Sequence, residues 1–146
     1  MAATVDTTLK YLGERPRKTT AAAKLSYAKA LCVAPQVSSN AVGRLAKNLQ
    51  VSADVVLQVS KIPVRTYHRR QAAQELLTET ESDRLLRIAR VALQAEQVFG
   101  SSEKSTRWLS ANSRILGAAP LDLLATDAGA REVEYELVRI EYGDFA

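Results

Sequence analysis

The sequence has very little cysteine and histidine, and this shortage excludes several classes of protein. Its single cysteine, Cys32, cannot form an internal disulfide, so the chain is not a disulfide-stabilised secreted domain. One cysteine and one histidine, His68, cannot supply the ligands of a zinc site, and we expect neither a metal nor a cofactor. Cys32 is more typical of a small core residue than of a nucleophile. Because His68 has no carboxylate or nucleophile at a suggestive spacing, we expect the chain not to be an enzyme.

Long apolar runs are also absent. None approaches the roughly 20 residues of a membrane-spanning helix, and the first residues, MAATVDTTLKYLG, lack the apolar centre of a secretory signal. We therefore expect a cytoplasmic protein with no membrane partner. Strand patterns are nearly absent too, so the predicted fold class is all-α. The 146 residues allow one sizeable core or two small ones.

Charges of opposite sign are concentrated in different halves of the chain. Residues 1–75 hold 12 Lys and Arg against 4 Asp and Glu, a net charge of +8, whereas residues 76–146 hold 8 against 12, a net charge of −4. A basic half attracts polyanions and an acidic half repels them. Charged side chains that only solvate a surface are the alternative. The asymmetry favours different partners for the two halves.

The stretch 51–70, VSADVVLQVSKIPVRTYHRR, has the pattern of two short helices joined by a tight turn. Ser52 is a candidate N-cap of the first helix. Pro63 cannot continue that helix, but it suits the start of a second one, predicted from Pro63 to about Gln74 with Tyr67 facing inward. This is the arrangement of a Cro-like helix-turn-helix, whose second helix enters the major groove of DNA.

The outward face of this second helix carries the candidate DNA-reading side chains. Arginine pairs well with guanine in the major groove, so we expect base contacts from Val64, Arg65, His68 and Arg69. Lys61 and Thr66 are expected to contact phosphates. Together with the N-cap Ser52, they complete the candidate DNA-binding set.

Two positions depart from a typical helix-turn-helix. Leu57 stands where a small residue is usual, and Lys61 stands in the turn where glycine is usual. A non-glycine residue with positive φ costs roughly 1 kcal/mol, which is tolerable. A helical hairpin that only packs, without reading DNA, is the alternative.

The residues before this motif predict a basic arm and two helices. Residues 1–18, which include Arg15-Pro16-Arg17-Lys18, contain little that could pack, so we expect a mobile arm able to reach a DNA groove, with a solvated tail as the alternative. Thr19 or Thr20 can cap a helix through Leu31. A further helix, Ala41–Leu49 with Ser39 as its N-cap, is expected to be the first helix of the DNA-binding bundle.

A long helix is predicted after the motif. Thr78 and Glu81 fit a capping box, from which a helix can run unbroken to Phe99. Apolar residues cover half of its circumference or more, so it is expected to be the spine between the two halves, part of a dimer interface, or both. The domains expected are therefore the arm and first helix (1–38), the helix-turn-helix (39–77), and a last domain (78–146) that includes the linker helix 79–99.

Glycines and caps divide the rest of the chain into short helices. Gly100 ends the long helix, Ser102 or its neighbour caps the next, and Pro120 starts another after the loop 112–119. Trp108 is expected in the core. The last helix is expected to begin at a cap, Thr126 or Asp127, and to end at Gly143. Its packing face carries Val133, Leu137 and Ile140, and the acidic residues beside that face are Glu132, Glu134, Glu136 and Glu141.

A specific run of residues lies within 98–143. It consists of Val98-Phe99-Gly100, Trp108-Leu109, Asn112, Leu116-Gly117, Pro120-Leu121, Leu123-Leu124, Thr126, Gly129 and Arg139-Ile140-Glu141-Tyr142-Gly143. In order and spacing it resembles the toxin-binding domain of the Xre/MbcA/ParS-type antitoxins, and 82–87 resembles the start of that family's linker helix. With the helix-turn-helix, the resemblance covers residues 40–143. A departure is Ala111, where a proline often precedes the asparagine.

This resemblance implies a type II toxin–antitoxin system. In that family the antitoxin binds a RES-domain toxin that attacks NAD⁺ or transfers ADP-ribose from it. Its C-terminal end obstructs the toxin's active-site cleft, and its N-terminal half represses the shared promoter. The implied partners are a RES-domain toxin and operator DNA, bound by a homodimer within a larger complex. The residues then expected to contact the toxin are Arg139, Glu141, Tyr142, Gly143, Asp144 and Phe145.

Two other functions remain open from the sequence. One is a stand-alone helix-turn-helix transcriptional regulator without a toxin partner. The other is a toxin inhibitor whose helix-turn-helix no longer binds DNA.

Overall fold

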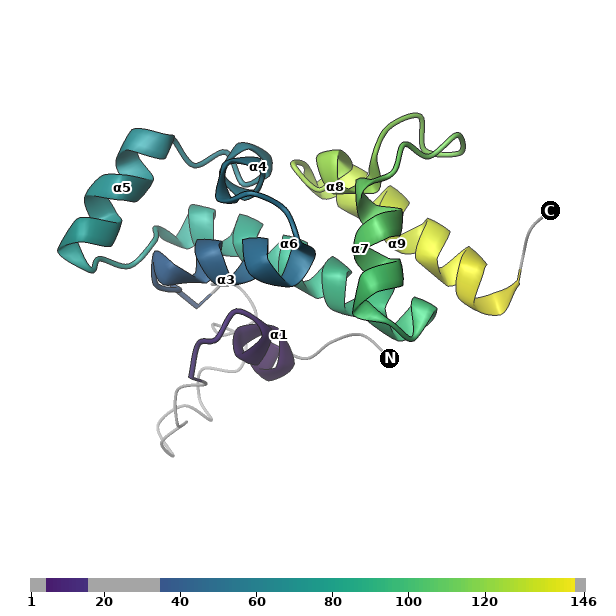
Figure 1. Cartoon of the computed structure of the whole chain (residues 1–146), viewed down its shortest axis with the longest axis horizontal. Helices are drawn as coiled ribbons and strands as arrows, with labels where there is room; N and C mark the ends of the chain where they lie inside the picture. Colours follow the sequence, from purple (N-terminus) through teal and green to yellow (C-terminus); the bar gives the residue numbers. More distant parts are fainter. Residues whose placement is uncertain (1–4, 16–34, 144–146) are drawn as a thin grey trace.

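The computed structural model describes residues 5–15 and 35–143, and every regular element in these ranges is a helix (Figure 1). The helices are α1 (Val5–Tyr11), α3 (Asn40–Leu49), α4 (Ala53–Val59), α5 (Val64–Ala73), α6 (Glu79–Phe99), α7 (Ser102–Ser110), α8 (Pro120–Leu123) and α9 (Asp127–Tyr142). The predicted all-α class is confirmed. The helix expected between Thr19 and Leu31 lies outside the described residues.

Helix α6 is the central element of the fold, and other helices lie along its length (Figure 1). The predicted capping box is present: the Thr78 hydroxyl accepts from the Glu81 N–H at 3.2 Å, and the Glu81 carboxylate accepts from the Thr78 N–H at 3.0 Å. Gly100, with φ 66°, ends the helix as predicted. The expectation that this helix is a spine is therefore confirmed.

The apolar side chains of α6 are covered by other helices of the same chain. Helices α1, α3, α7 and α9 all pack against it, and α1 reaches as far as Glu96 near its C-terminal end. The fully buried apolar residues of α6 are Leu85, Ile88, Ala89, Val91, Ala92 and Ala95. Because one chain already buries them, they are not available for the dimer interface that was the second expectation for this helix.

Helix α1 corrects the expectation of a mobile arm. Residues 5–12 do pack: Thr8, Leu9 and Leu12 are buried, and the Tyr11 hydroxyl donates to Glu96 Oε1 at 3.2 Å. Leu9 and Leu12 stand three residues apart, the spacing of one helix face. A stripe this short carries little signal in sequence, and burial against α3 and α6 stabilises it. The basic residues that follow at 16–18 lie outside the described residues.

A short backbone pairing joins the residues before α3 to those before α6. The Leu77 N–H donates to the Val37 carbonyl at 2.8 Å, and the Val37 N–H donates to Ser82 Oγ at 3.1 Å. These bonds hold the beginning and the end of the α3–α5 bundle together. Ser39 precedes α3 as predicted, but its side chain makes no capping hydrogen bond.

Side-chain caps set the C-terminal helices in place. The Ser101 hydroxyl, not that of Ser102, accepts from the Lys104 N–H at 3.4 Å, and the Thr126 hydroxyl accepts from the Gly129 N–H at 3.0 Å. Pro120 starts α8 as predicted. Helix α9 then lies along α6 (Figure 1), and this packing positions the groove described below.

Two residues of this half lie differently from expectation. Glu136 was expected at an exposed flank of α9, but it is buried, because it stands three residues after Val133 on the packed side of the helix. Its carboxylate is paired with Arg139 Nη1 at 3.2 Å. Trp108 was expected in the core and is only half-buried, against Phe99 with ring centroids 5.5 Å apart. The core position on α7 is taken by Leu109.

Candidate DNA-binding helix and partner-binding groove

The turn between α4 and α5 has the geometry that the sequence predicts. The Ser52 hydroxyl caps α4 by accepting from the Val55 N–H at 3.4 Å. Lys61 adopts the left-handed region with φ 55°, and the Ile62 N–H donates to the Leu57 carbonyl at 2.9 Å, closing the turn. Helix α5 begins at Val64, one residue later than predicted, because Pro63 is extended and serves as the N-cap.

Helix α5 stands at one end of the molecule and is held by few side chains (Figure 1). Tyr67 is the only residue of this helix that is buried. Leu57 on α4 is buried as well, at the position where a small residue is usual. The inward direction of Tyr67 confirms the predicted orientation of α5, which leaves the opposite side of the helix in solvent.

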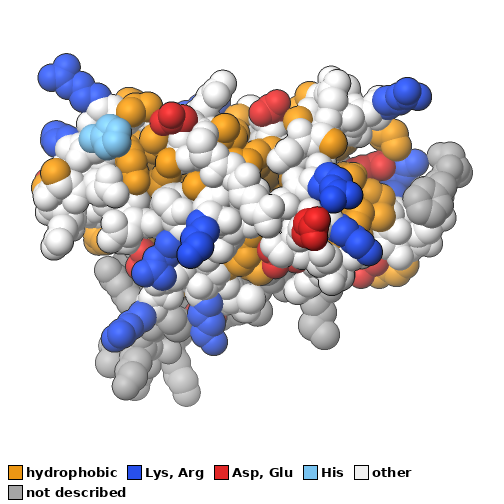
Figure 2. All heavy atoms as spheres, in the orientation of Figure 1, with side chains coloured by type: hydrophobic (Ala, Val, Ile, Leu, Met, Phe, Trp, Pro, Cys, Tyr) orange, Lys and Arg blue, Asp and Glu red, His pale blue; other side chains and the backbone are white. Residues whose placement is uncertain are grey.

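The candidate reading side chains share this exposed side. Val64, Arg65, His68 and Arg69 are all exposed, and Thr66 is half-buried. Lys61 and Ser52 are exposed near the start of the two helices. Figure 2 shows Lys and Arg side chains projecting at this end of the molecule. The structure thus brings the predicted set together on an accessible surface, while DNA contact itself stays a prediction.

An ion pair that sequence reasoning missed fixes the far end of α5. Arg70 Nη1 is paired with Glu81 Oε2, the same oxygen that accepts from the Thr78 N–H in the capping box of α6. Both side chains are only 12% exposed. Arg70 therefore faces the body of the protein, unlike Arg69 beside it. The signal in the sequence was the 100° rotation per residue, which turns neighbouring arginines to different sides of a helix.

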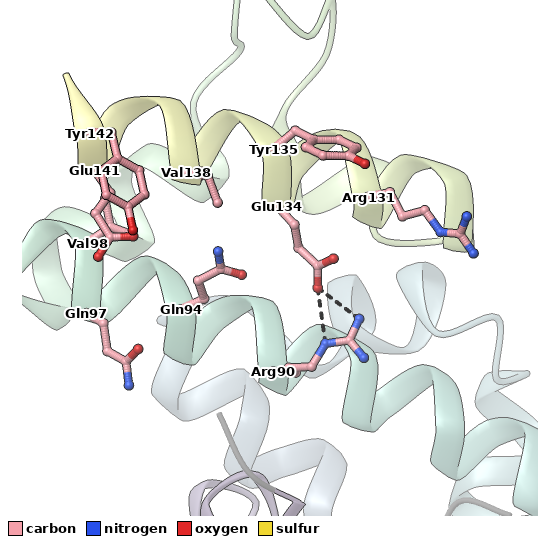
Figure 3. A pocket seen from close by; sticks show the side chains of 10 residues that line it. All are labelled: Arg90, Gln94, Gln97, Val98, Arg131, Glu134, Tyr135, Val138, Glu141 and Tyr142. Atoms are coloured by element: carbon pink, nitrogen blue, oxygen red, sulfur yellow. Dashed lines mark hydrogen bonds and ion pairs between the residues drawn. The ribbon is translucent and has the colours of Figure 1, made fainter. Parts of the chain in front are cut away.

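A groove lies between α6 and α9 (Figure 3). Its volume is about 510 Å³, and its walls carry Arg90, Gln94, Gln97 and Val98 from α6 and Arg131, Glu134, Tyr135, Val138, Glu141 and Tyr142 from α9. In Figure 3, Glu141 and Tyr142 lie at one end next to Val98, and Arg131 and Tyr135 lie towards the other end. An ion pair spans the groove, with Arg90 Nη2 at 2.9 Å from Glu134 Oε1.

The side of α9 along this groove is more apolar than the sequence analysis anticipated. Tyr135 is 67% exposed, Val138 40% and Tyr142 79%. These three stand at spacings of three and four residues, which place them on one face of the helix. Val133 and Leu137 form the buried face of the same helix. Helix α9 thus has two apolar stripes, and among the described residues only one of them is packed against other helices.

The residues expected to contact a toxin fall into three groups. Glu141 and Tyr142 are exposed and line the groove. Arg139 is partly buried and paired with Glu136, and Gly143 ends α9 with φ 69°. Asp144 and Phe145 lie outside the described residues. Sequence reasoning missed Tyr135 and Val138, whose spacing with Tyr142 was the available signal.

The parts of the chain that the structure describes contain neither a cluster of metal ligands nor a membrane-spanning helix. Within residues 5–15 and 35–143, no group of three or more His, Cys, Asp or Glu side chains could hold a metal ion. In the same ranges, no helix combines the length and apolar character that crossing a bilayer requires.

Two family models match the chain. The Antitoxin Xre-like helix-turn-helix domain matches residues 33–90, which contain α3 to α5 and the first part of α6. The Antitoxin Xre/MbcA/ParS C-terminal toxin-binding domain matches residues 94–143, which contain the groove-lining part of α9. Neither is a family of enzymes.

Curated proteins named Antitoxin Xre are similar to the chain. The one from Pseudomonas putida is 42% identical over 83 residues, 56% of this chain and 52% of the relative. The one from Photorhabdus laumondii is 34% identical over 90 residues, 60% of this chain and 61% of the relative. The one from Yersinia enterocolitica is 36% identical over 93 residues, 62% of this chain and 63% of the relative. The matched segments thus span between 52% and 63% of these relatives' own length.

The two matched domains stand in the order that the fold displays, with the helix-turn-helix first and the second domain after most of α6. The chain therefore belongs to the Xre/MbcA/ParS family of antitoxins.

Proposed function

We propose that the chain is an antitoxin that neutralises a RES-domain, NAD⁺-consuming or ADP-ribosylating toxin by obstructing its active site, and that it represses its own operon by binding operator DNA. The family membership supports the antitoxin role and the helix-turn-helix. The choice of a RES-domain toxin is supported by the family resemblance noted in the sequence. The proposed partners are thus one protein, the toxin, and one nucleic acid, the operator DNA.

The single observation that carries the neutralising role is the unpacked stripe of α9. Tyr135, Val138 and Tyr142 are exposed within the segment that matches the toxin-binding domain. Large apolar side chains in solvent beside a groove are typical of a protein–protein interface, where tyrosine is enriched. Glu141 adds negative charge at the end of this stripe. A toxin cleft that holds the phosphates of a dinucleotide is expected to be cationic, so the acidic end of α9 complements it.

DNA binding is proposed for the exposed side of α5. Arg65 and Arg69 stand four residues apart on one face, accessible from solvent and on the half of the chain with a net charge of +8. An α-helix fits the major groove, and arginine contacts guanine there through two hydrogen bonds. We propose that Val64 and His68 join these contacts, and that Lys61 and Thr66 contact phosphates while Ser52 supports the turn.

A homodimer is part of the same proposal. Helix-turn-helix proteins generally bind as dimers, with two half-sites about one helical turn apart. Leu76, at 45% exposure, is an exposed apolar side chain of the DNA-binding half that is not among the proposed DNA contacts. Sedimentation equilibrium tests this proposal: a dimer mass is expected, and a monomer at all concentrations contradicts it.

The experiment that tests the function joins both activities. The chain is produced with the product of the adjacent reading frame, which the proposal expects to be a RES-type toxin, and growth and cellular NAD⁺ are measured with and without the chain. The proposal expects copurification, restored growth and preserved NAD⁺, together with salt-dependent binding to the promoter fragment of that operon. DNA binding without any protection identifies a stand-alone regulator, and protection without DNA binding identifies an inhibitor alone. Either result contradicts the proposal.

A further inference from the structure

A second basic surface lies apart from α5, in a cleft of about 710 Å³ between α1, α3 and the α6–α7 junction. Three exposed cations line it: Lys10 on α1, and Arg44 and Lys47 on α3. Figure 2 shows Lys and Arg side chains gathered over α3 and α1 on the same face that displays basic side chains at the outer end of α5. The two basic surfaces can therefore be approached from one side.

Helix α1 completes this cleft, although it precedes both segments that match the family models. Burial of Leu9 and Leu12 fixes α1 against the body, and the Asn48 amide donates to the Tyr11 carbonyl at 2.7 Å, joining α3 to the end of α1. Lys10 is thereby held on the same side as the cations of α3. The α1 segment thus adds a positive charge to a surface that α3 alone would form only in part.

The turn after α1 also places Arg44. A Cβ atom built on Gly13 would lie 2.0 Å from Arg44 Nη1, so the guanidinium rests directly against the bare backbone of Gly13. Gly13 has φ +73°, a conformation that glycine adopts without strain. In the described residues no carboxylate is paired with Lys10, Arg44 or Lys47, so their charges are not cancelled by an ion pair.

The acidic groups near the cleft are already engaged. Glu96 lies in its wall and accepts the hydroxyl hydrogen of Tyr11. Glu14, in the turn after α1, accepts from both the N–H and the hydroxyl of Ser38. The cleft therefore presents three cations against the single carboxylate of Glu96, a net positive charge.

We propose that this cleft is a second DNA-contacting surface, which binds the phosphate backbone beside the segment read by α5. The inference rests on the proposed DNA binding by α5 and extends it to a surface that no sequence motif marks. Lys and Arg side chains that neutralise phosphates release counterions, and they strengthen binding without reading the sequence. The side chains Lys10, Arg44 and Lys47 perform this role, and they supply affinity rather than specificity.

The polar groups of the cleft favour a polyanion over a small phosphate ligand. The side chains of Tyr11 and Asn48, which line the cleft, are already hydrogen-bonded to other parts of the chain. A small ligand site is expected to direct a few fixed polar groups at its ligand. Here the available donors are long side chains at an exposed rim, which suit a charged backbone running across it.

The test compares two double variants that remove the same charge. Arg44→Gln with Lys47→Gln alters the cleft, and Arg107→Gln with Arg114→Gln alters exposed arginines of the C-terminal half. Binding to the operator and to an unrelated duplex of equal length is measured by fluorescence anisotropy from low to physiological salt. Melting temperatures of all proteins are compared, and these exposed substitutions are expected to leave them unchanged.

The cleft variant is expected to bind both duplexes more weakly, with the slope of log K against log salt shallower by about 2. The control variant keeps the wild-type slope, and Lys10→Gln alone makes it shallower by about 1. If wild type binds the operator and Arg65→Ala binds it more weakly, but the cleft variant keeps the wild-type salt slope, the inference is overturned and the proposed function stands. No binding of wild type to any duplex overturns both. Calorimetric binding of inorganic pyrophosphate that requires Arg44 and Lys47, without any effect on DNA, assigns the cleft to a small ligand and overturns the inference as well.

Discussion

Arg70 of α5 and Glu81 of α6 form an ion pair in which a single carboxylate oxygen serves two elements. Glu81 Oε2 accepts from Arg70 and also from the Thr78 N–H at the start of α6. The N-terminal end of the central helix thereby holds the C-terminal end of the candidate DNA-reading helix. Since Tyr67 is the only buried residue of α5, this pair is a major constraint on how the helix is presented.

Arg70→Ala should destabilise the protein by about 3 kcal/mol, because it leaves the largely buried Glu81 carboxylate without its cation. It should also weaken operator binding, although Arg70 does not face the DNA side. Thermal unfolding and anisotropy measure the two effects. Arg69→Ala is the matched control: its side chain is exposed, so stability should change by less than about 0.5 kcal/mol. Equal melting curves for the two variants would mean that the pair does not hold α5.

Arg65→Ala should weaken specific operator binding by about 1–3 kcal/mol and relax the preference for the operator over other sequences. The reason is the loss of the two hydrogen bonds that we propose between this side chain and a guanine edge in the major groove. Competition binding with operator and random duplexes measures both quantities, with the melting curve as a check of folding. If Arg65→Ala and Arg69→Ala both bind like wild type, α5 is not the reading helix.

Much of this arrangement is predictable from sequence because it is local. Ser52, Thr78 and Thr126 cap their helices, and Gly100 and Gly143 end theirs, as short-range hydrogen bonding and backbone freedom require. The exposed side of α5 follows from the inward direction of Tyr67. These features depend on residues within about four positions of one another.

The features that sequence reasoning missed depend on contacts between distant segments. Leu9 and Leu12 show too little periodicity to predict α1, and only packing against α3 and α6 stabilises the helix. The groove beside Tyr135 and Val138 exists because α9 lies along α6, which no local pattern specifies. Burial of Glu136 likewise depends on the packing of this side of α9 against the distant helices of the chain.

Gly129 and Gly43 should respond in opposite ways to substitution by alanine. A Cβ at Gly129 would lie 2.1 Å from the Leu123 carbonyl oxygen, a backbone atom that cannot easily move, so Gly129→Ala should destabilise by about 1–3 kcal/mol. A Cβ at Gly43 meets nothing within 4 Å, so Gly43→Ala in α3 should stabilise by about 0.5–1 kcal/mol through the unfolded state. Urea unfolding measures both. A stabilised Gly129→Ala variant would contradict the close approach of α8 to α9.

Tyr11 should make stability fall at alkaline pH. Burial, and then the charge and hydrogen bond of Glu96, raise the pKa of Tyr11 well above its ordinary value of 10.0. The unfolded chain releases this proton first, so the free energy of unfolding contributed by Tyr11 is fully present below pH 10.0 and decreases as pH rises beyond it. Urea unfolding at a series of pH values measures this fall.

Tyr11→Phe should make the alkaline fall less steep, at the cost of about 1 kcal/mol near neutral pH for the lost hydrogen bond to Glu96. Tyr135→Phe is the control, because that side chain is 67% exposed, and it should keep the wild-type profile. A Tyr11→Phe variant with the wild-type alkaline profile would show that the hydroxyl is not held as described.

We propose that the exposed side of α9 neutralises the toxin, and the decisive measurement is NAD⁺ consumption by purified toxin at increasing antitoxin concentration. The double variant Tyr142→Ala with Glu141→Ala removes two exposed side chains at one end of the groove. The control, Ile115→Ala, removes a large side chain that is 65% exposed on the loop between α7 and α8. All of these side chains are exposed, so the variants should melt like wild type. The α9 variant is expected not to inhibit the toxin at concentrations where wild type and Ile115→Ala inhibit it fully. Full inhibition by the α9 variant, with loss of inhibition by Ile115→Ala, would show that α9 is not the neutralising surface and would place neutralisation on the surface around Trp108 to Leu124.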